Sequence, residues 1–285
     1  MSGALVSFLA MAVSARELSA ALGTFQILFF RSVIGLLVLA LLLSRSGWHQ
    51  LATASIGLHF ARNIAHYAGQ FGWFYSIAVI PLAAVFAIET TTPIWTAVFA
   101  VFLLDERITR ARCAAIFLGF AGVLVILRPG AAVIHPAAIA MLLGAVAFGL
   151  SITLTKKLAA RDAPMAILFY MALIQLPLGL LPATFSWVNP APPLWPWLIA
   201  VGLTSLTAHY CMVRALAVAD ATVVIPMAFL QLPLISLLGF LLYNERIEWF
   251  LFMGAALILA GNLVNVRAEQ RGARMENSPG IRRRP

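Results

Sequence analysis

The sequence predicts an all-α integral membrane protein of about ten transmembrane helices, arranged as two inverted-topology five-helix repeats. Hydrophobic residues make up 62% of the 285 residues and charged residues 10%, against roughly 25% charged in soluble domains. The chain also repeats itself: after a shift of 139 residues, Leu103–Ile108 (LLDERI) falls on Leu242–Ile247 (LYNERI). Each copy is predicted to hold five spans, an odd number, so the second copy enters the bilayer from the opposite side. This architecture is typical of secondary transporters.

Nine apolar runs reach the roughly 20 residues that a span needs. They cover residues 24–43, 58–80, 83–104, 112–128, 136–157, 164–187, 195–218, 222–243 and 249–266. A tenth run, residues 1–15, measures about 22 Å as a helix, less than the hydrocarbon core of roughly 30 Å. Because the shift places it inside the run at 136–157, we interpret it as a short first helix whose start can lie upstream.

The expected domains are a first repeat over residues 1–130, a second over 131–267, and a basic tail over 268–285. Short cytoplasmic loops carry an excess of Lys and Arg, and here these residues gather on alternate connections and in the tail. Both termini are therefore expected to be cytoplasmic. The polar tail, with Arg282–Arg284, is interpreted as a disordered anchor attracted to anionic lipid rather than a nucleic-acid site, since no binding fold accompanies it.

Ionisable and polar residues inside spans point to function or to pairing. In the run at 58–80, one polar stripe follows helical spacing, and in the run at 83–104 a second stripe surrounds a proline. The first stripe is Arg62, His66, Gln70 and Trp73, and the second is Glu89, Thr92, Pro93 and Thr96. We expect Arg62 to extend to the cytoplasmic headgroups. His66 lies near the cytoplasmic end of the same run, and we expect it to serve mainly in contacts between helices.

Glu89 has two open interpretations. It is either a proton-coupling or substrate-cation site, or a structural partner of Arg31, because both residues lie on the order of 10 Å from the outer face. For Arg31 the alternatives are pairing with Glu89, binding of a substrate carboxylate, and extension to the interface. We expect the ion pair between Arg31 and Glu89.

The repeat predicts which polar residues converge on the centre. The shift of 139 places Gln70 on His209 and Thr92 on Gln231, and equivalent positions around a pseudo-two-fold axis face one cavity. The alternative for His209 and Gln231 is hydrogen bonding between helices. The predicted substrate site consists of Gln70, Glu89, Thr92, His209 and Gln231, with Phe71, Trp73 and Tyr75 as aromatic walls.

Acidic and basic residues adjoin at two predicted helix ends. Glu106 and Arg107 follow the run at 83–104, and Glu245 and Arg246 follow the run at 222–243. Each pair is either a gate latch or a cap of the fold, and an exposed pair contributes only about 0 to 1 kcal/mol.

No motif for catalysis or metal binding is present. The sequence lacks Gly-x-Ser-x-Gly, His-Glu-x-x-His and Walker patterns. Cys113 and Cys211 lie in apolar stretches, away from any partner at metal-ligand spacing. We therefore expect no enzyme, no metal and no cofactor.

The chain resembles the drug/metabolite transporter superfamily, and within it the EamA-type ten-helix permeases, over residues 1 to about 267. The resemblance rests on Phe29–Ser32, Trp73–Tyr75, Pro81–Ala83, Thr92–Trp95 and the Glu-Arg pairs at 106–107 and 245–246. Family members place a glycine before that Glu, where Asp105 and Asn244 stand here. The resemblance implies a bacterial inner-membrane carrier without ATP hydrolysis, commonly an exporter driven by proton exchange.

We thus expect a secondary active transporter that exports a zwitterionic or cationic amino-acid-like metabolite, with metallophores and drug-like compounds as further candidates. The alternatives are an uptake permease for S-adenosylmethionine or a vitamin, and a non-coupled channel. The expected partners are the small-molecule substrate, protons and membrane lipids. Either a monomer or a homodimer fits the sequence.

Overall fold

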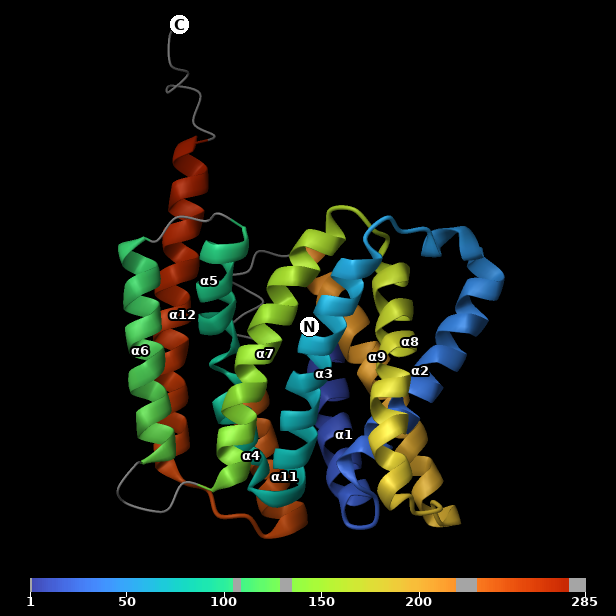
Figure 1. The fold of residues 1–285 in the computed structure, drawn as a ribbon. Helices are drawn as coiled ribbons and strands as arrows, with labels where there is room; N and C mark the ends of the chain where they lie inside the picture. Colours follow the sequence, from blue (N-terminus) through green and yellow to red (C-terminus); the bar gives the residue numbers. More distant parts are fainter. Residues whose placement is uncertain (1, 105–108, 129–134, 219–229, 277–285) are drawn as a thin grey trace, which may run out of the picture.

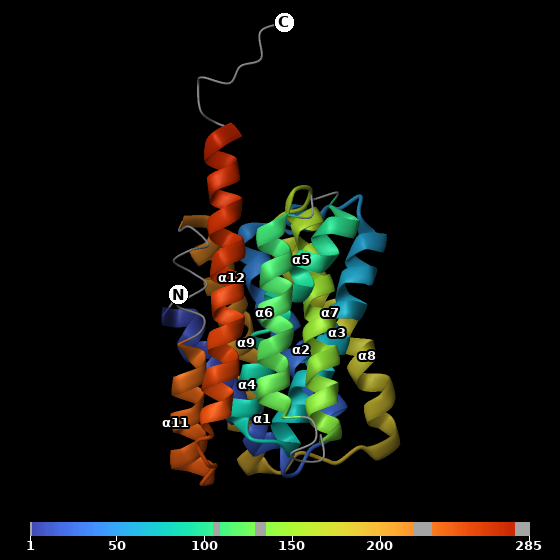
Figure 2. The ribbon, with the colours of Figure 1, turned by 90° about the vertical axis from the view of Figure 1, so that its left-hand side faces the viewer.

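The computed structural model describes residues 2–104, 109–128, 135–218 and 230–276. Within these ranges the chain forms helices and turns and no strand, so the all-α prediction is confirmed. The long helices run side by side through one bundle, with the connections at its two ends (Figures 1 and 2). The α-helices are α1 (Ser2–Ser19), α2 (Thr24–Ser46), α3 (Ile56–Val79), α4 (Leu82–Glu89), α5 (Thr92–Leu103), α6 (Arg110–Leu127), α7 (Pro136–Ala159), α8 (Pro164–Ala183), α9 (Trp195–Val218), α11 (Gln231–Tyr243) and α12 (Trp249–Glu276).

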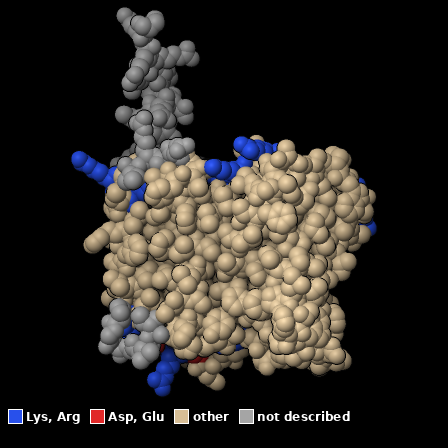
Figure 3. Space-filling view, viewed as in Figure 1, with Lys and Arg blue, Asp and Glu red and all other residues tan. Residues whose placement is uncertain are grey.

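The bundle is a multi-span membrane fold. Six stretches of the described chain are long and apolar enough to cross a membrane. Helices α1, α3 and α9 are not among these six, but they pack against them in the same bundle. In Figure 3, charged side chains gather near the two ends of the molecule and leave a broad uncharged belt between them. The six stretches are Thr24–Ser46, Leu82–Leu103, Arg110–Leu127, Pro136–Ala159, Pro164–Ser186 and Trp249–Ala268.

The helix bounds follow the sequence repeat. The bounds of α3 and α9 differ by 139 residues at both ends, and the starts of α5 and α11 differ by the same number. Helices of the first half pack mainly on helices of the second half. Helix α3 packs along α7 and α1 along α9, while α2 packs on α8 and α6 on α12. These contacts are the ones expected of two repeats around a pseudo-two-fold axis. The division of the chain at residue 130 itself stays a prediction.

The predicted run at 83–104 forms two helices, α4 and α5, rather than one. Between α4 and α5, the hydroxyl groups of Thr90 and Thr91 donate to the carbonyl oxygens of Ala87 and Ile88, bonds of the kind that compete with a helix ladder. The backbone N–H of Thr91 also bonds to Ile88, which tightens the turn to 3₁₀ geometry. Pro93 follows in the first turn of α5, where a proline is tolerated. The break leaves Glu89 as the last residue of α4.

Small residues allow α3 and α7 to approach closely. A Cβ atom added to Gly72 would lie 2.4 Å from the carbonyl oxygen of Ala140 and 3.2 Å from the Cα atom of Gly144. Close backbone contact through small residues is a common way to join helices in membranes. It fixes the polar face of α3 with respect to the other half of the chain.

Candidate functional site

A polar cluster is buried where α2, α3, α8 and α9 meet, and Arg31 lies at its centre. Arg31 is 4% exposed. Its Nη1 donates to Ser205 Oγ at 2.7 Å, and its Nη2 donates to the Oε1 atoms of Gln70 and Gln175, each at 3.0 Å. All three acceptors are neutral, so the guanidinium charge is solvated by dipoles from three helices.

The hydrogen bonds continue along α3 toward its N-terminal end. The amide nitrogen of Gln175 lies 3.0 Å from His66 Nδ1 and donates to Asn63 Oδ1 at 3.4 Å. Because an amide nitrogen can only donate, Nδ1 of His66 acts as an acceptor in this arrangement. Arg62 Nη1 donates to the same Asn63 oxygen at 2.7 Å, and Arg62 Nε donates to Thr155 Oγ1 of α7 at 3.0 Å. Arg62 is 5% exposed, so the expectation that it extends to the headgroups is wrong.

His209 joins the cluster from α9. Its Nδ1 lies 2.8 Å from the carbonyl oxygen of Ser205, one turn earlier in the helix. Its ring centroid is 5.6 Å from that of His66 and 6.0 Å from that of Phe8. The repeat-equivalent residues Gln70 and His209 thus lie in one cluster, although their role in binding stays a prediction.

The cluster carries positive charge without a matching anion. Within the described ranges, no carboxylate forms an ion pair with Arg31 or Arg62. Two buried donors in the cluster, Arg31 Nε and Asn63 Nδ2, have no hydrogen-bond partner. A buried cation usually has a partner because removing its hydration is costly. The arrangement can therefore accept an oxygen-rich anionic group.

Glu89 lies apart from Arg31, so the predicted ion pair is wrong. Glu89 Oε2 accepts a hydrogen bond from Trp73 Nε1 at 2.8 Å. Residue counting placed the two charges at one depth, but it could not give their lateral positions. Helix α2 packs mainly on α8 and α9, whereas α4 packs on α11, α7 and α12. Trp73 is three residues after Gln70, so the partners of the two charges lie on neighbouring turns of α3, about 4.5 Å apart in depth.

The other predicted site residues are not joined to the cluster by any hydrogen bond that the described residues form. The ring of Tyr75 stacks on Phe71, with centroids 6.1 Å apart. Thr92 is buried and its hydroxyl has no partner, and Gln231 is the partly buried first residue of α11. Sequence reasoning missed Gln175 and Ser205. The available signals were a lone amide in an apolar run and the shift, which places Ser205 on His66.

Glu245 forms a latch between three segments at one end of the bundle. Its Oε1 accepts from Arg16 Nη2 at 2.7 Å, and its Oε2 accepts from the backbone N–H of Leu82 at 2.8 Å, the first residue of α4. Arg16 also donates to the carbonyl oxygen of Ile80 at 2.7 Å. Burial raises the pKa of Glu245, while the Leu82 N–H and Arg16 oppose that rise. Glu245 thus caps the start of α4 and joins it to α1, and its role as a gate latch stays a prediction.

Arg246, the other described residue of the two predicted pairs, forms no comparable contact with the described residues. Arg246 is exposed, and the ionic partner of Glu245 is Arg16 of α1 instead of this neighbour. Glu106 and Arg107 lie outside the described residues.

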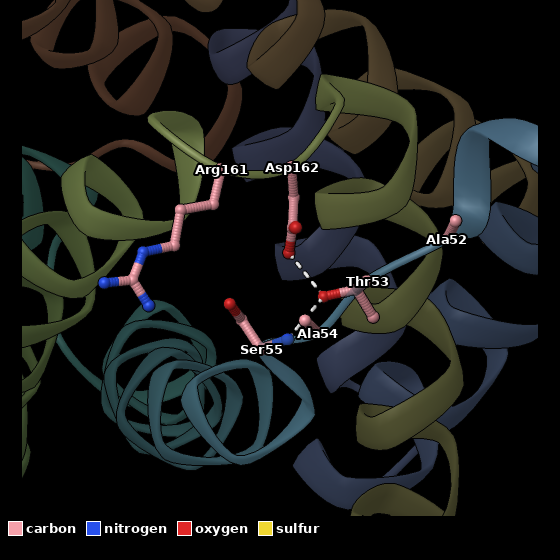
Figure 4. A pocket seen from close by; sticks show the side chains of 6 residues that line it. All are labelled: Ala52, Thr53, Ala54, Ser55, Arg161 and Asp162. Atoms are coloured by element: carbon pink, nitrogen blue, oxygen red, sulfur yellow. Dashed lines mark hydrogen bonds between the residues drawn. The ribbon is translucent and has the colours of Figure 1, made fainter.

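A buried contact between a histidine and an aspartate lies at the opposite end of the bundle. Asp162, in the turn after α7, accepts from Thr53 Oγ1 at 2.7 Å and lies 2.7 Å from His59 Nε2 of α3. The side chains of His59 and Asp162 are 0% and 3% exposed. An open hollow of about 660 Å³ adjoins this pair (Figure 4), lined by Ala52, Thr53, Ala54, Ser55, Arg161 and Asp162.

Comparisons with known proteins agree with this fold. A model of the EamA-like transporter family matches residues 1–128 and 135–267. The S-adenosylmethionine uptake transporter of Rickettsia prowazekii is 24% identical over 91% of this chain and 88% of that protein. The riboflavin transporter of Rhizobium johnstonii is 31% identical over 81% and 77%, and the pseudopaline exporter of Pseudomonas aeruginosa is 28% identical over 93% of each. One crystal structure aligns with a TM-score of 0.64 at 20% identity, over 95% of this chain and 98% of that chain.

Removing the Glu245 carboxylate is expected to destabilise the protein. Glu245→Ala leaves the Leu82 N–H without its acceptor and Arg16 without its anion, although Arg16 still donates to Ile80, and this costs about 1 to 3 kcal/mol. Thermal unfolding of the purified protein in detergent measures the loss. Glu248→Ala is the matched control, because the Glu248–Arg128 pair is exposed and contributes less than about 1 kcal/mol. Equal changes in Tm for the two variants would contradict the latch.

Proposed function

We infer the function from the premise that this chain belongs to the EamA-like transporter family. It is a multi-pass membrane transporter, and its named relatives support a small metabolite as the substrate. We propose that it exports an amino-acid-like metabolite that bears a carboxylate, in exchange for protons. The buried Arg31 guanidinium, which has only neutral acceptors, carries this proposal.

Arg31 offers a fork of donors that matches a carboxylate. In the observed arrangement, oxygens of Gln70, Gln175 and Ser205 occupy this fork. A substrate carboxylate would replace neutral acceptors by a charged one, and it can accept two parallel N–H bonds from the same guanidinium. The three released side chains can then bind other polar atoms of the substrate.

The Glu89 carboxylate can bind either the ammonium group of the same substrate or a proton. Its hydrogen-bond partner Trp73 lies one turn of α3 from Gln70, so the negative and positive groups are offset along one helix. One carboxylate cannot hold a proton and an ammonium group together. Occupancy by either one therefore displaces the other, which is the requirement for exchange.

The direction of transport has a second candidate. The pseudopaline exporter of Pseudomonas aeruginosa covers 93% of this chain at 28% identity, which supports export. Uptake of S-adenosylmethionine is favoured by the names of four relatives at 24% to 26% identity. That compound also carries an amino-acid carboxylate, so the proposed role of Arg31 is the same in both directions. A non-coupled channel is the alternative that flux measurements separate from a carrier.

We further propose the bacterial inner membrane as the location, with both termini cytoplasmic and with repeats over residues 1–130 and 131–267. The named relatives come from bacteria. The basic residues Lys156, Lys157 and Arg161 lie in and after the last turn of α7, as expected for a cytoplasmic end.

Loss of the Arg31 charge is expected to abolish selective transport. In proteoliposomes loaded with a panel of amino acids, S-adenosylmethionine and vitamins, the wild-type protein should move carboxylate-bearing compounds in a saturable way. Arg31→Gln should reduce this flux at least about tenfold, since a hydrogen bond to a charged group contributes about 1.5 to 3 kcal/mol. Arg31→Lys should retain an intermediate rate because the charge stays and the fork is lost. The control is Arg45→Gln at the exposed end of α2, and equal flux in all four proteins would exclude this role for Arg31.

Neutralising Glu89 is expected to uncouple transport from protons. Glu89→Gln keeps an acceptor for Trp73 but removes the group that a proton and an ammonium share. An imposed pH gradient should then no longer drive accumulation, while exchange down the substrate gradient persists. Glu248→Gln is the control. A Glu89→Gln protein with unchanged pH-dependent transport would show that Glu89 is a structural partner only.

A further inference from the structure

The buried cluster contains two guanidinium groups rather than one. Arg62 of α3 is 5% exposed, almost as buried as Arg31 at 4%. Two amide side chains connect them: Gln175 binds Arg31 through Oε1 and Asn63 through Nε2, and Asn63 Oδ1 binds Arg62. Three hydrogen bonds of 3.0, 3.4 and 2.7 Å place the two guanidinium groups within on the order of 10 Å of each other.

Donors exceed acceptors throughout this chain of contacts. Each guanidinium has five N–H donors, and their described acceptors are the neutral oxygens of Ser205, Gln70, Gln175, Asn63 and Thr155. Two buried groups without a partner, Arg31 Nε and Asn63 Nδ2, are donors, and the Tyr67 hydroxyl of the same helix as Asn63, which can donate or accept, is also unpartnered. One of the two donors lies on Arg31 and the other lies beside Arg62. The shortage of acceptors therefore exists at both ends of the cluster.

A single carboxylate at Arg31 would leave the second buried cation without an anion. Two acids of helices and turns that contact α3 have other partners: Glu89 binds Trp73, and Asp162 binds His59 and Thr53. Two like charges within on the order of 10 Å repel each other in a medium of low dielectric constant. Neutral dipoles offset this repulsion only in part, and a ligand with two anionic groups would offset it fully.

We propose that the substrate carries two acidic groups, of which one binds at Arg31 and the second at Arg62. This inference rests on the proposed function and narrows its substrate class to amino-acid-like metabolites with an additional carboxylate. Arg62 lies three residues after His59, and Asp162, the partner of His59, lines the open hollow at that end of the bundle (Figure 4). The second acidic group thus lies on the side of the cluster that faces the hollow, and the ammonium group lies on the side of Glu89.

A purely structural role for Arg62 makes a different prediction. In that case Arg62 only joins α3 to α7 through Thr155, and its substitution lowers stability without changing the preference among ligands. The readout must therefore be the ratio of the half-maximal concentrations of two ligands that differ in one acidic group. A general loss of stability affects both concentrations and cancels from their ratio.

Matched acids and amides provide this readout. The full chain in detergent is titrated with L-glutamate or L-glutamine, and with L-aspartate or L-asparagine, and the half-maximal concentration for thermal stabilisation is recorded. We expect each acid to act at a concentration at least about tenfold lower than its amide. Arg62→Gln should bring this ratio close to one, whereas Arg45→Gln should leave it unchanged.

Arg62→Lys provides a second variant in case Arg62→Gln does not fold. It keeps the charge and should retain a preference for the acid, reduced from the wild-type ratio. Equal half-maximal concentrations for acid and amide in the wild-type protein overturn the inference, and so does a preference that survives Arg62→Gln. Absence of any response to both dicarboxylates overturns it as well. If monocarboxylates still respond and Arg31→Gln abolishes that response, the proposed function stands and only the second acidic group is refuted.

Discussion

The arrangement of the helices depends on how one buried cation is solvated. A charged side chain inside a span is costly, and it persists where other groups of the protein solvate it. Arg31 meets this requirement with oxygens from α3, α8 and α9. Two of these hydrogen bonds, those to Gln175 and Ser205, cross between the two halves of the sequence, since α2 belongs to the first half and α8 and α9 to the second. Binding at Arg31 would therefore act on the contacts between the halves.

The two ends of the bundle are closed by different chemistry. At one end, Glu245 connects α1, the start of α4 and the segment after α11. At the other end, His59 and Asp162 connect α3 to the turn after α7. The polar cluster lies between these closures. In a carrier whose halves move against each other around a central site, the two closures would open in turn.

Much of the fold could be predicted from the sequence. The length of the apolar runs reflects the thickness of the bilayer, and the 139-residue shift reveals two similar halves. The shift also indicated that Gln70 and His209 would converge, and the structure brings both into one cluster. Lateral position was harder to predict. Counting residues gives a depth along each helix, but it does not say which helices are neighbours, and so Arg31 was assigned to Glu89 instead of Gln175 and Ser205. The break after Glu89 depends on local hydroxyl bonds that no span-length argument contains.

Arg31 as the anchor of a substrate carboxylate is the central claim. The most direct measurement compares one transported carboxylate with its methyl ester as competitors for flux, in the wild-type protein and in Arg31→Gln. The ester keeps the shape of the substrate but lacks the charge. The account predicts that the wild-type protein prefers the acid at least about tenfold and that Arg31→Gln has no preference. Equal competition by acid and ester in the wild-type protein would contradict it.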